Sequence, residues 1–262
     1  MVNFELKARY GVYDLEKLIA LLRSDEGCPW DREQTHESIR RNLLEEAYEA
    51  VEAIDKRDAE HLKEELGDVL IQVLFHSRIE EEAGSFNLDD VADAVCKKLI
   101  YRHPHVFGDV QASCSEQVLE NWDKLKKREK NQDTVGSEMD MVAKSLPALW
   151  RAEKIQAKAA KTGFDWTDIS GAIEKLEEEI NELKAAIAGN GDMEEELGDL
   201  LFTAVNISRF IGCDPEEALH KSSDKFVRRF KKLEARAGKL GKKLSDMTLT
   251  EMDKLYNEEK QH

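Results

Sequence analysis

One sequence pattern occurs twice in this chain, and this duplication restricts the folds that the chain can adopt. The stretch LLEEAYEAVEAI at residues 43–54 has a counterpart, LEEEINELKAAI, at residues 176–187. Further along, EELGDVL at residues 64–70 is matched by EELGDLL at residues 195–201. Similar segments in the same order indicate two copies of one supersecondary unit rather than a chance resemblance.

A polar segment separates the two copies. KNQDTVGSEMDM begins at residue 130, contains Gly136 and has no clear apolar periodicity. These properties are typical of a linker. We therefore predict an N-terminal unit at residues 1–130, a linker at 131–144 and a C-terminal unit at 145–262.

Both units are predicted to be helical. Leu66, Val69, Leu70 and Val73 follow the i, i+3, i+4, i+7 spacing of one helix face. The chain of 262 residues has only 14 Gly and 4 Pro, which suits long helices with few turns. No stretch alternates in the manner of a strand. We expect an all-α protein made of two tandem helical bundles.

Four carboxylates of the N-terminal unit are spaced as if to meet. Glu46 and Glu49 are three residues apart, as are Glu65 and Asp68, and residues so spaced share one helix face. Both pairings, 46 with 68 and 49 with 65, are symmetric about position 57. A chain reversal near Arg57 would therefore bring all four acids level across an antiparallel helix pair.

The C-terminal unit repeats this arrangement with Glu179, Glu182, Glu196 and Asp199. Its centre of symmetry falls in Gly189-Asn190-Gly191, a sequence that favours a turn. Carboxylates held together repel one another unless a cation binds them. A hard divalent ion with oxygen ligands, Mg²⁺ or Mn²⁺, is the expected occupant. No His follows at i+3, which argues against a di-iron site.

Two glycines lie at equivalent positions inside the predicted helices. Gly67 and Gly198 each follow the Glu-Glu-Leu of the repeated motif. A glycine within a helix costs about 1 kcal/mol relative to alanine. We therefore expect a close backbone approach at both positions, either to a helix or to a ligand.

The net charge of −16 argues against a broad nucleic-acid or anionic-membrane surface. Apolar stretches such as Val69–Phe75 are too short to span a bilayer. Cys28, Cys96, Cys114 and Cys213 form no CxxC pair, so we expect reduced thiols in a cytoplasmic protein.

The motifs EExxE, EELGD and the following Lys-x-x-x-Arg pair resemble those of the MazG family of nucleoside triphosphate pyrophosphohydrolases, which have the all-α NTP pyrophosphatase fold. The resemblance extends over essentially the whole chain and includes GCPWDREQT, RHPHVF and GFDW. It implies Mg²⁺-dependent hydrolysis of NTPs and dNTPs between the α and β phosphates, giving monophosphate and pyrophosphate. It also implies a homodimer that cleans or regulates the nucleotide pool, with the C-terminal unit as the main catalytic one.

The resemblance assigns roles to individual residues. The expected metal ligands are the eight acids already described: Glu179, Glu182, Glu196, Asp199, Glu46, Glu49, Glu65 and Asp68. The first Glu of each EExxE, Glu178 or Glu45, is the candidate that orients the attacking water. The expected substrate-binding residues are a basic pair and an aromatic in each unit: Lys225, Arg229, Tyr256, Lys98, Arg102 and Trp122.

Other interpretations stay open. The chain could be a non-catalytic helical scaffold that binds nucleotide or metal in a regulatory role. It could also be a narrower enzyme, acting on dUTP, dCTP or phosphoribosyl-ATP, because sister families share the same acids. Tyr256 and Trp122 are equally consistent with ordinary packing of a terminal helix.

Overall fold

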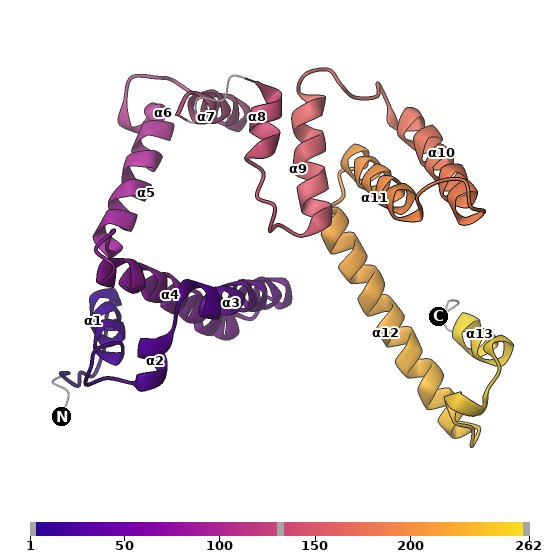
Figure 1. The fold of residues 1–262 in the computed structure, drawn as a ribbon, viewed down its shortest axis with the longest axis horizontal. Coiled ribbons are helices and arrows are strands. Elements are labelled where there is room, and N and C mark those ends of the chain that lie inside the picture. Colours follow the sequence, from indigo (N-terminus) through magenta and orange to yellow (C-terminus); the bar gives the residue numbers. More distant parts are fainter. Residues whose placement is uncertain (1–3, 130–133, 259–262) are drawn as a thin grey trace. The chain divides into compact units, whose positions relative to one another are not determined.

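A computed structural model describes residues 4–129 and 134–258, and all regular elements in those ranges are helices. The all-α prediction is confirmed. The chain divides into two compact units, at Met1–Glu129 and Lys130–His262 (Figure 1). No helix of the described ranges combines the length and apolar character needed to cross a membrane.

The elements of unit 1 are α1 (Val12–Leu22), α2 (Pro29–Glu33), α3 (His36–Lys56), α4 (Ala59–Glu82), α5 (Leu88–Arg102), α6 (Pro104–Phe107) and α7 (Ser115–Glu129). Those of unit 2 are α8 (Val135–Asp140), α9 (Ala148–Ala160), α10 (Ile169–Ile187), α11 (Met193–Phe210), α12 (Pro215–Lys239), the 3₁₀ helix η1 (Leu244–Asp246) and α13 (Leu249–Glu258).

A hairpin of α3 and α4 forms the centre of unit 1 (Figure 1). Thr35 caps α3, and its side chain accepts a hydrogen bond from the Ser38 amide. The chain reverses at Arg57, whose φ of 55° is left-handed, and Asp58 then caps α4. The predicted reversal at this point is confirmed.

Helix α1 closes one side of this hairpin. The buried residues Ile19, Ile39, Leu74 and Phe75 form an apolar core between α1, α3 and α4. Arg23, which ends α1, is also buried and forms an ion pair of 2.8 Å with Glu82. The segment between α1 and α3 is thereby held to the end of α4.

Unit 2 has its own hairpin, formed by α10 and α11. The turn contains Gly189 and Gly191 with φ of 95° and 149°, a region that glycine adopts readily. Asp192 caps α11 by accepting hydrogen bonds from the Glu194 and Glu195 amides. Helix α9 packs against α11 much as α1 packs against α4.

Part of the predicted linker is structured. Helix α8 lies inside the range 131–144 and packs against α9. Glu138 of α8 is buried and forms an ion pair with Lys158 at 3.4 Å. A helix of only six residues is too short to produce a periodic pattern, so the sequence gives no sign of it. Residues 131–133 lie outside the described ranges.

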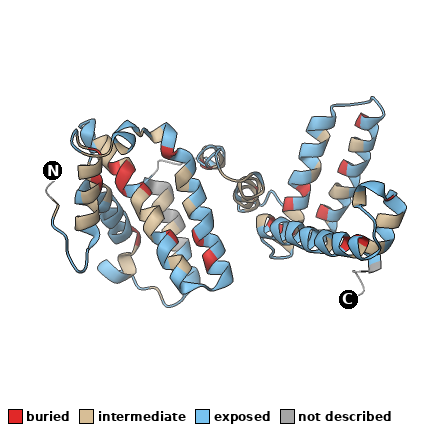
Figure 2. Ribbon diagram, turned by 90° about the horizontal axis from the view of Figure 1, so that it is seen from below, coloured by how far each residue is buried: buried red, intermediate tan, exposed pale blue. Residues whose placement is uncertain are grey.

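The two helical glycines do not approach another helix within their units. A Cβ added to Gly67 or to Gly198 would meet no atom within 4 Å. Of the two expected alternatives, approach to a helix is therefore wrong for the described residues, and approach to a ligand stays a prediction. Exposed positions also run along much of the ribbon in both units, with buried residues in the minority (Figure 2).

Candidate active site

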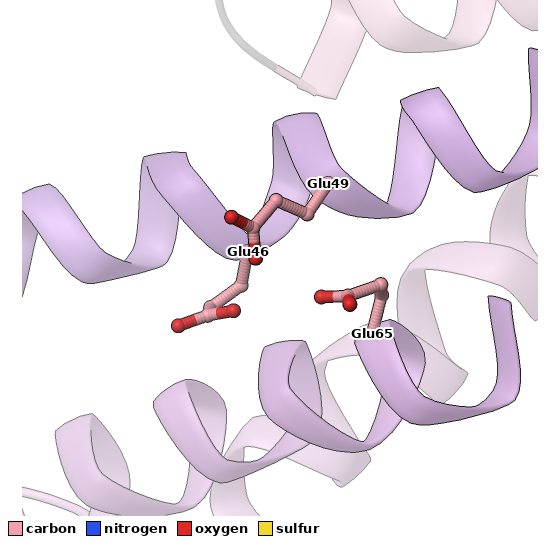
Figure 3. A group of neighbouring side chains, drawn as sticks. All are labelled: Glu46, Glu49 and Glu65. Carbon is pink, nitrogen blue, oxygen red and sulfur yellow. The ribbon is translucent and has the colours of Figure 1, made fainter. Parts of the chain in front are cut away.

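Three carboxylates meet between α3 and α4 of unit 1. Glu46 and Glu49 project from α3 and Glu65 from α4, toward one shared space (Figure 3). One oxygen of each lies within 4.8 Å of the others. Asp68, the fourth predicted ligand, is not part of this group, although its charge acts on Glu46.

Two carboxyl groups of this unit 1 cluster, those of Glu46 and Glu65, have raised pKa values. Burial raises the pKa of Glu46, and the charges of Asp68 and Glu49 raise it further. Burial also raises the pKa of Glu65, together with the charge of Glu49, while His61 opposes the shift from 2.9 Å. A bound cation would relieve the same repulsion.

The corresponding group in unit 2 consists of Glu179, Glu196 and Asp199, again with one oxygen of each within 4.8 Å of the others. Glu179 is buried. The fourth predicted ligand, Glu182, is outside the group, but burial raises its pKa and the charges of Glu179 and Glu196 add to that effect. The structure thus gathers three of four predicted ligands in each unit.

Lys175 is a member of the unit 2 site that the sequence analysis missed. Its Nζ lies 2.8 Å from Glu178, 2.9 Å from Glu179 and 4.0 Å from Glu182. Hydrogen bonds to Glu178 and Glu179 raise the pKa of Lys175. It stands one helical turn before Glu179, a spacing visible in the sequence, whereas the equivalent position in unit 1 is Asn42.

A cavity of about 680 Å³ opens beside the acids of unit 2. Lys175, Glu179 and Asp199 line one part of it, and residues of α9, α11 and the segment before α10 line the rest. Cavities of this size typically hold small-molecule ligands. A reactive group placed at the acids would therefore have enclosed space beside it for the remainder of a substrate.

The acidic groups fit a hard divalent cation. Glu179 Oε2 is buried and has no hydrogen-bond partner, and the same is true of Glu65 Oε2 in unit 1. A buried carboxylate oxygen without a donor is destabilised unless a cation or proton satisfies it. Clustered carboxylate oxygens of this kind suit Mg²⁺ or Mn²⁺.

The two candidate water-orienting residues lie next to these groups but outside them. Glu45 accepts a hydrogen bond from Arg41 Nε at 2.9 Å, and its side chain is half exposed. Glu178 pairs with Lys175. Their catalytic role stays a prediction.

Two of the predicted substrate-binding residues of unit 1, Arg102 and Trp122, contact each other. Arg102 is buried, donates two hydrogen bonds to Glu129, and lies 5.4 Å from the Trp122 ring. Lys98 is exposed on the same helix, α5. Arg102 would have to leave Glu129 before it could bind a phosphate.

In unit 2, Lys225 and Arg229 are carried by α12 and Tyr256 by α13. The Tyr256 ring lies 6.0 Å from that of Phe226. None of these three residues lines the cavity beside the acids in the described chain. Their role in binding substrate stays a prediction.

Comparison with known proteins identifies the family. The MazG nucleotide pyrophosphohydrolase domain matches residues 34–107 and again residues 169–233. The chain is 46% identical to the nucleoside triphosphate pyrophosphohydrolase/pyrophosphatase MazG of Thermotoga maritima, with 94% of each chain covered. It is 39% identical to the nucleoside triphosphate pyrophosphohydrolase of Escherichia coli K12, covering 94% of this chain and 97% of that one.

A third relative, the uncharacterized protein YabN of Bacillus subtilis, is 48% identical over 93% of this chain and half of its own length. The domain match occurs twice, and each copy includes the four acids of one unit. The chain therefore belongs to the MazG family of nucleotide pyrophosphohydrolases.

Proposed function

We propose that unit 2 hydrolyses nucleoside triphosphates, both NTPs and dNTPs, between the α and β phosphates and depends on Mg²⁺ to do so. One observation carries this proposal: a lysine and two of the three clustered carboxylates line a cavity large enough for a nucleotide. The relatives named as nucleoside triphosphate pyrophosphohydrolases support the same reaction. The proposed role is to clean or regulate the nucleotide pool.

Glu179, Glu196 and Asp199 would hold the metal, and Glu182 stays a proposed fourth ligand, as the sequence predicts. Bound Mg²⁺ supplies a Lewis acid that polarises phosphoryl oxygens and offsets the negative field of a chain with net charge −16. Mn²⁺ has the same ligand preference. The acids of unit 1 would form a second cation site.

In the proposed reaction, water attacks the α phosphorus and the bond from that phosphorus to the bridging oxygen breaks. Pyrophosphate leaves with that oxygen, and the proton of the water passes to a carboxylate. Glu178 is the proposed acceptor, because its pairing with Lys175 holds it beside the ligands. Lys175 is placed to attract phosphate oxygens, and Lys225 and Arg229 share one face of α12 for the same purpose.

A homodimer is part of this proposal. Several large apolar side chains of α10, α11 and α12 are more than a third exposed, including Ile180, Leu197, Leu201, Phe226 and Phe230. Contiguous exposed apolar surface on a water-soluble helix bundle indicates an interaction face. A second copy would cover these side chains, and it could supply Lys225 and Arg229 to a site that they do not line within one chain.

Product analysis tests the proposed reaction. The purified chain is incubated with Mg²⁺ and each NTP and dNTP in water enriched in ¹⁸O. We expect monophosphate and pyrophosphate, with the label in the monophosphate because water attacks the α phosphorus. Diphosphate and phosphate would contradict the proposed bond, and nucleotide binding without turnover would favour the regulatory scaffold.

A further inference from the structure

The cavity of unit 2 continues along α11, away from the acids. Its lining extends from Asp199 to Arg209, ten residues or about 15 Å of helix. The metal ligands and Lys175 lie toward the first of these residues, while Gln156 and Trp166 also line the cavity from α9 and from the segment before α10. Phosphates held at the acids would therefore leave the nucleoside to occupy the remaining length.

Two polar groups of this cavity have no hydrogen-bond partner among the residues that the structure describes. Gln156 is 5% exposed, and its Nε2 donates to the Phe202 carbonyl at 2.7 Å. Because that carbonyl can only accept, the amide orientation is fixed and Gln156 Oε1 is left as a buried acceptor without a donor.

Arg209 has an unpaired donor, whereas Gln156 has an unpaired acceptor. Its Nη2 donates to Asp165 at 2.7 Å and to Asn206 at 2.8 Å. Its Nε is buried and has no acceptor. One cavity thus contains an unpaired acceptor and an unpaired donor, an arrangement that native proteins keep mainly where a ligand or water completes it.

Aromatic surface faces the same space. Phe164 and Trp166 line the cavity and are 83% and 39% exposed. The Trp166 ring lies so close to the next helix that a Cβ on Gly171 would come within 2.2 Å of its Cδ1 atom. Because Gly171 has no side chain, the Trp166 ring can lie against the helix that contains Gly171. An exposed indole held in this place is a suitable platform for base stacking.

We propose that this cavity binds the nucleobase of the substrate, with the base stacked on Trp166 and its edge paired with Gln156 Oε1 and Arg209 Nε. This inference rests on the proposed function, since it places the substrate's phosphates at the acids. Every common nucleobase has an N–H donor or amino group near a ring or carbonyl acceptor. The cavity then recognises a base as such and accepts several of them, consistent with broad specificity.

Unit 1 has larger side chains close to its hairpin. Counting seven residues back from Trp30 and from Trp166 gives Arg23 in unit 1 and Ala159 in unit 2. Counting eight residues on from the glycine of each EELGD gives Phe75 and Asn206. Arg23 and Phe75 are each 7% exposed, and the guanidinium lies 6.0 Å from the ring. At the second of these positions, the larger and buried Phe75 therefore stands in unit 1 where Asn206 borders the cavity in unit 2.

The test compares Gln156→Leu with wild type by steady-state kinetics. We expect KM for ATP to rise about tenfold with kcat nearly unchanged, because one buried hydrogen bond between Gln156 and the base is lost. Inorganic tripolyphosphate, which has no base, should inhibit both proteins with the same constant. Gln72→Leu is the matched control, because Gln72 is a buried glutamine of unit 1 whose Oε1 is also unpaired. It should leave KM unchanged.

A binding measurement makes the test independent of turnover. A triphosphate with a non-hydrolysable α–β linkage should quench the tryptophan fluorescence of the wild type and of Trp150→Phe. Trp150→Phe is the control, because Trp150 donates a hydrogen bond to Asp214 and does not line the cavity. The quench should be lost in Trp166→Phe, which retains an aromatic ring and the fold.

An unchanged KM in Gln156→Leu, or an equal loss of tripolyphosphate binding, would overturn the inference. So would a quench that persists in Trp166→Phe. A protein that shows the Trp166-dependent quench but hydrolyses nothing would refute the proposed function and support this base site.

Discussion

The two units carry the same four acids but differ in what lies beside them. In unit 1, Arg23 and Phe75 are buried next to the hairpin, and Arg23 is tied to Glu82. In unit 2, the smaller Asn206 stands at the position of Phe75 and, with Ala159, lines an open cavity. The comparison teaches that a set of metal ligands defines where a cation can bind, while neighbouring side-chain volume decides whether a substrate can reach it.

The units also differ in the basic side chain that lies next to their acids. His61 lies 2.9 Å from Glu65 in unit 1, whereas Lys175 contacts Glu178 and Glu179 in unit 2. Lysine remains charged over the whole working pH range. Unit 2 therefore keeps a fixed positive charge where phosphates are proposed to bind.

The largest effect is expected from the acids. Asp199→Asn should lower turnover of ATP on the order of 10³-fold, because it removes a ligand and a charge from the proposed metal site. The equivalent change in unit 1, Asp68→Asn, should change turnover less than twofold. Initial rates under saturating Mg²⁺ measure both, and a large loss in Asp68→Asn would refute the assignment of catalysis to unit 2.

Filling the cavity should have the next largest effect. Ala159→Arg adds a long side chain to the cavity wall, and we expect KM for ATP to rise about 10- to 100-fold through lost access. Stabilisation by Mg²⁺ alone should persist, since the acids are untouched. A thermal melt with and without Mg²⁺ checks that, and an unaltered KM would show that the cavity is not used.

Removing the Arg23 side chain from unit 1 should lower the stability of that unit and leave turnover unchanged. Arg23→Ala removes a buried guanidinium that pairs with Glu82 and donates to the Asp31 and Gln34 carbonyls. We expect the free energy of unfolding of unit 1 to fall by about 2–4 kcal/mol. Urea unfolding followed by circular dichroism measures this. Turnover per folded molecule that rises or falls severalfold would contradict the separation between the units.

The smallest effect concerns pH. The pKa of Glu46 is raised above its ordinary value of 4.5 in the folded chain. Such a group favours folding at pH below 4.5, and that contribution is lost as the pH rises through the folded-state pKa.

Glu46→Gln should therefore raise the Tm of the metal-free protein at pH 7 by about 1–2 °C, a gain that disappears at pH 4. Asp55→Asn is a suitable control, since Asp55 is an exposed residue of the same helix outside the acid group. A Tm gain that is equal at both pH values would contradict this account of Glu46.

Local patterns made much of the fold predictable. The symmetric spacing of the acids placed the reversals at Arg57 and at Gly189–Gly191, where the structure has them. Helix periodicity and turn chemistry act over a few residues, so they can be read without tertiary structure. Helix α8 was missed because six residues and a buried Glu138 carry no such pattern.

The site was predictable in part, for a physical reason. Helical spacing brings Glu179 together with Glu196 and Asp199, and it could also have identified Lys175 one turn earlier. The cavity was not foreseen, because it depends on side-chain volumes at Ala159 and Asn206, which come from different helices. Volume across a helix interface is a tertiary property, and one sequence does not display it.

Counting bound nucleotides tests the central difference between the units most directly. The full chain is titrated calorimetrically with a triphosphate that has a non-hydrolysable α–β linkage, at saturating Mg²⁺. We predict one nucleotide per chain, with binding weakened about 10- to 100-fold in Ala159→Arg and unchanged in Asp68→Asn. Two nucleotides per chain, or binding that depends on Asp68 and not on Ala159, would contradict the account.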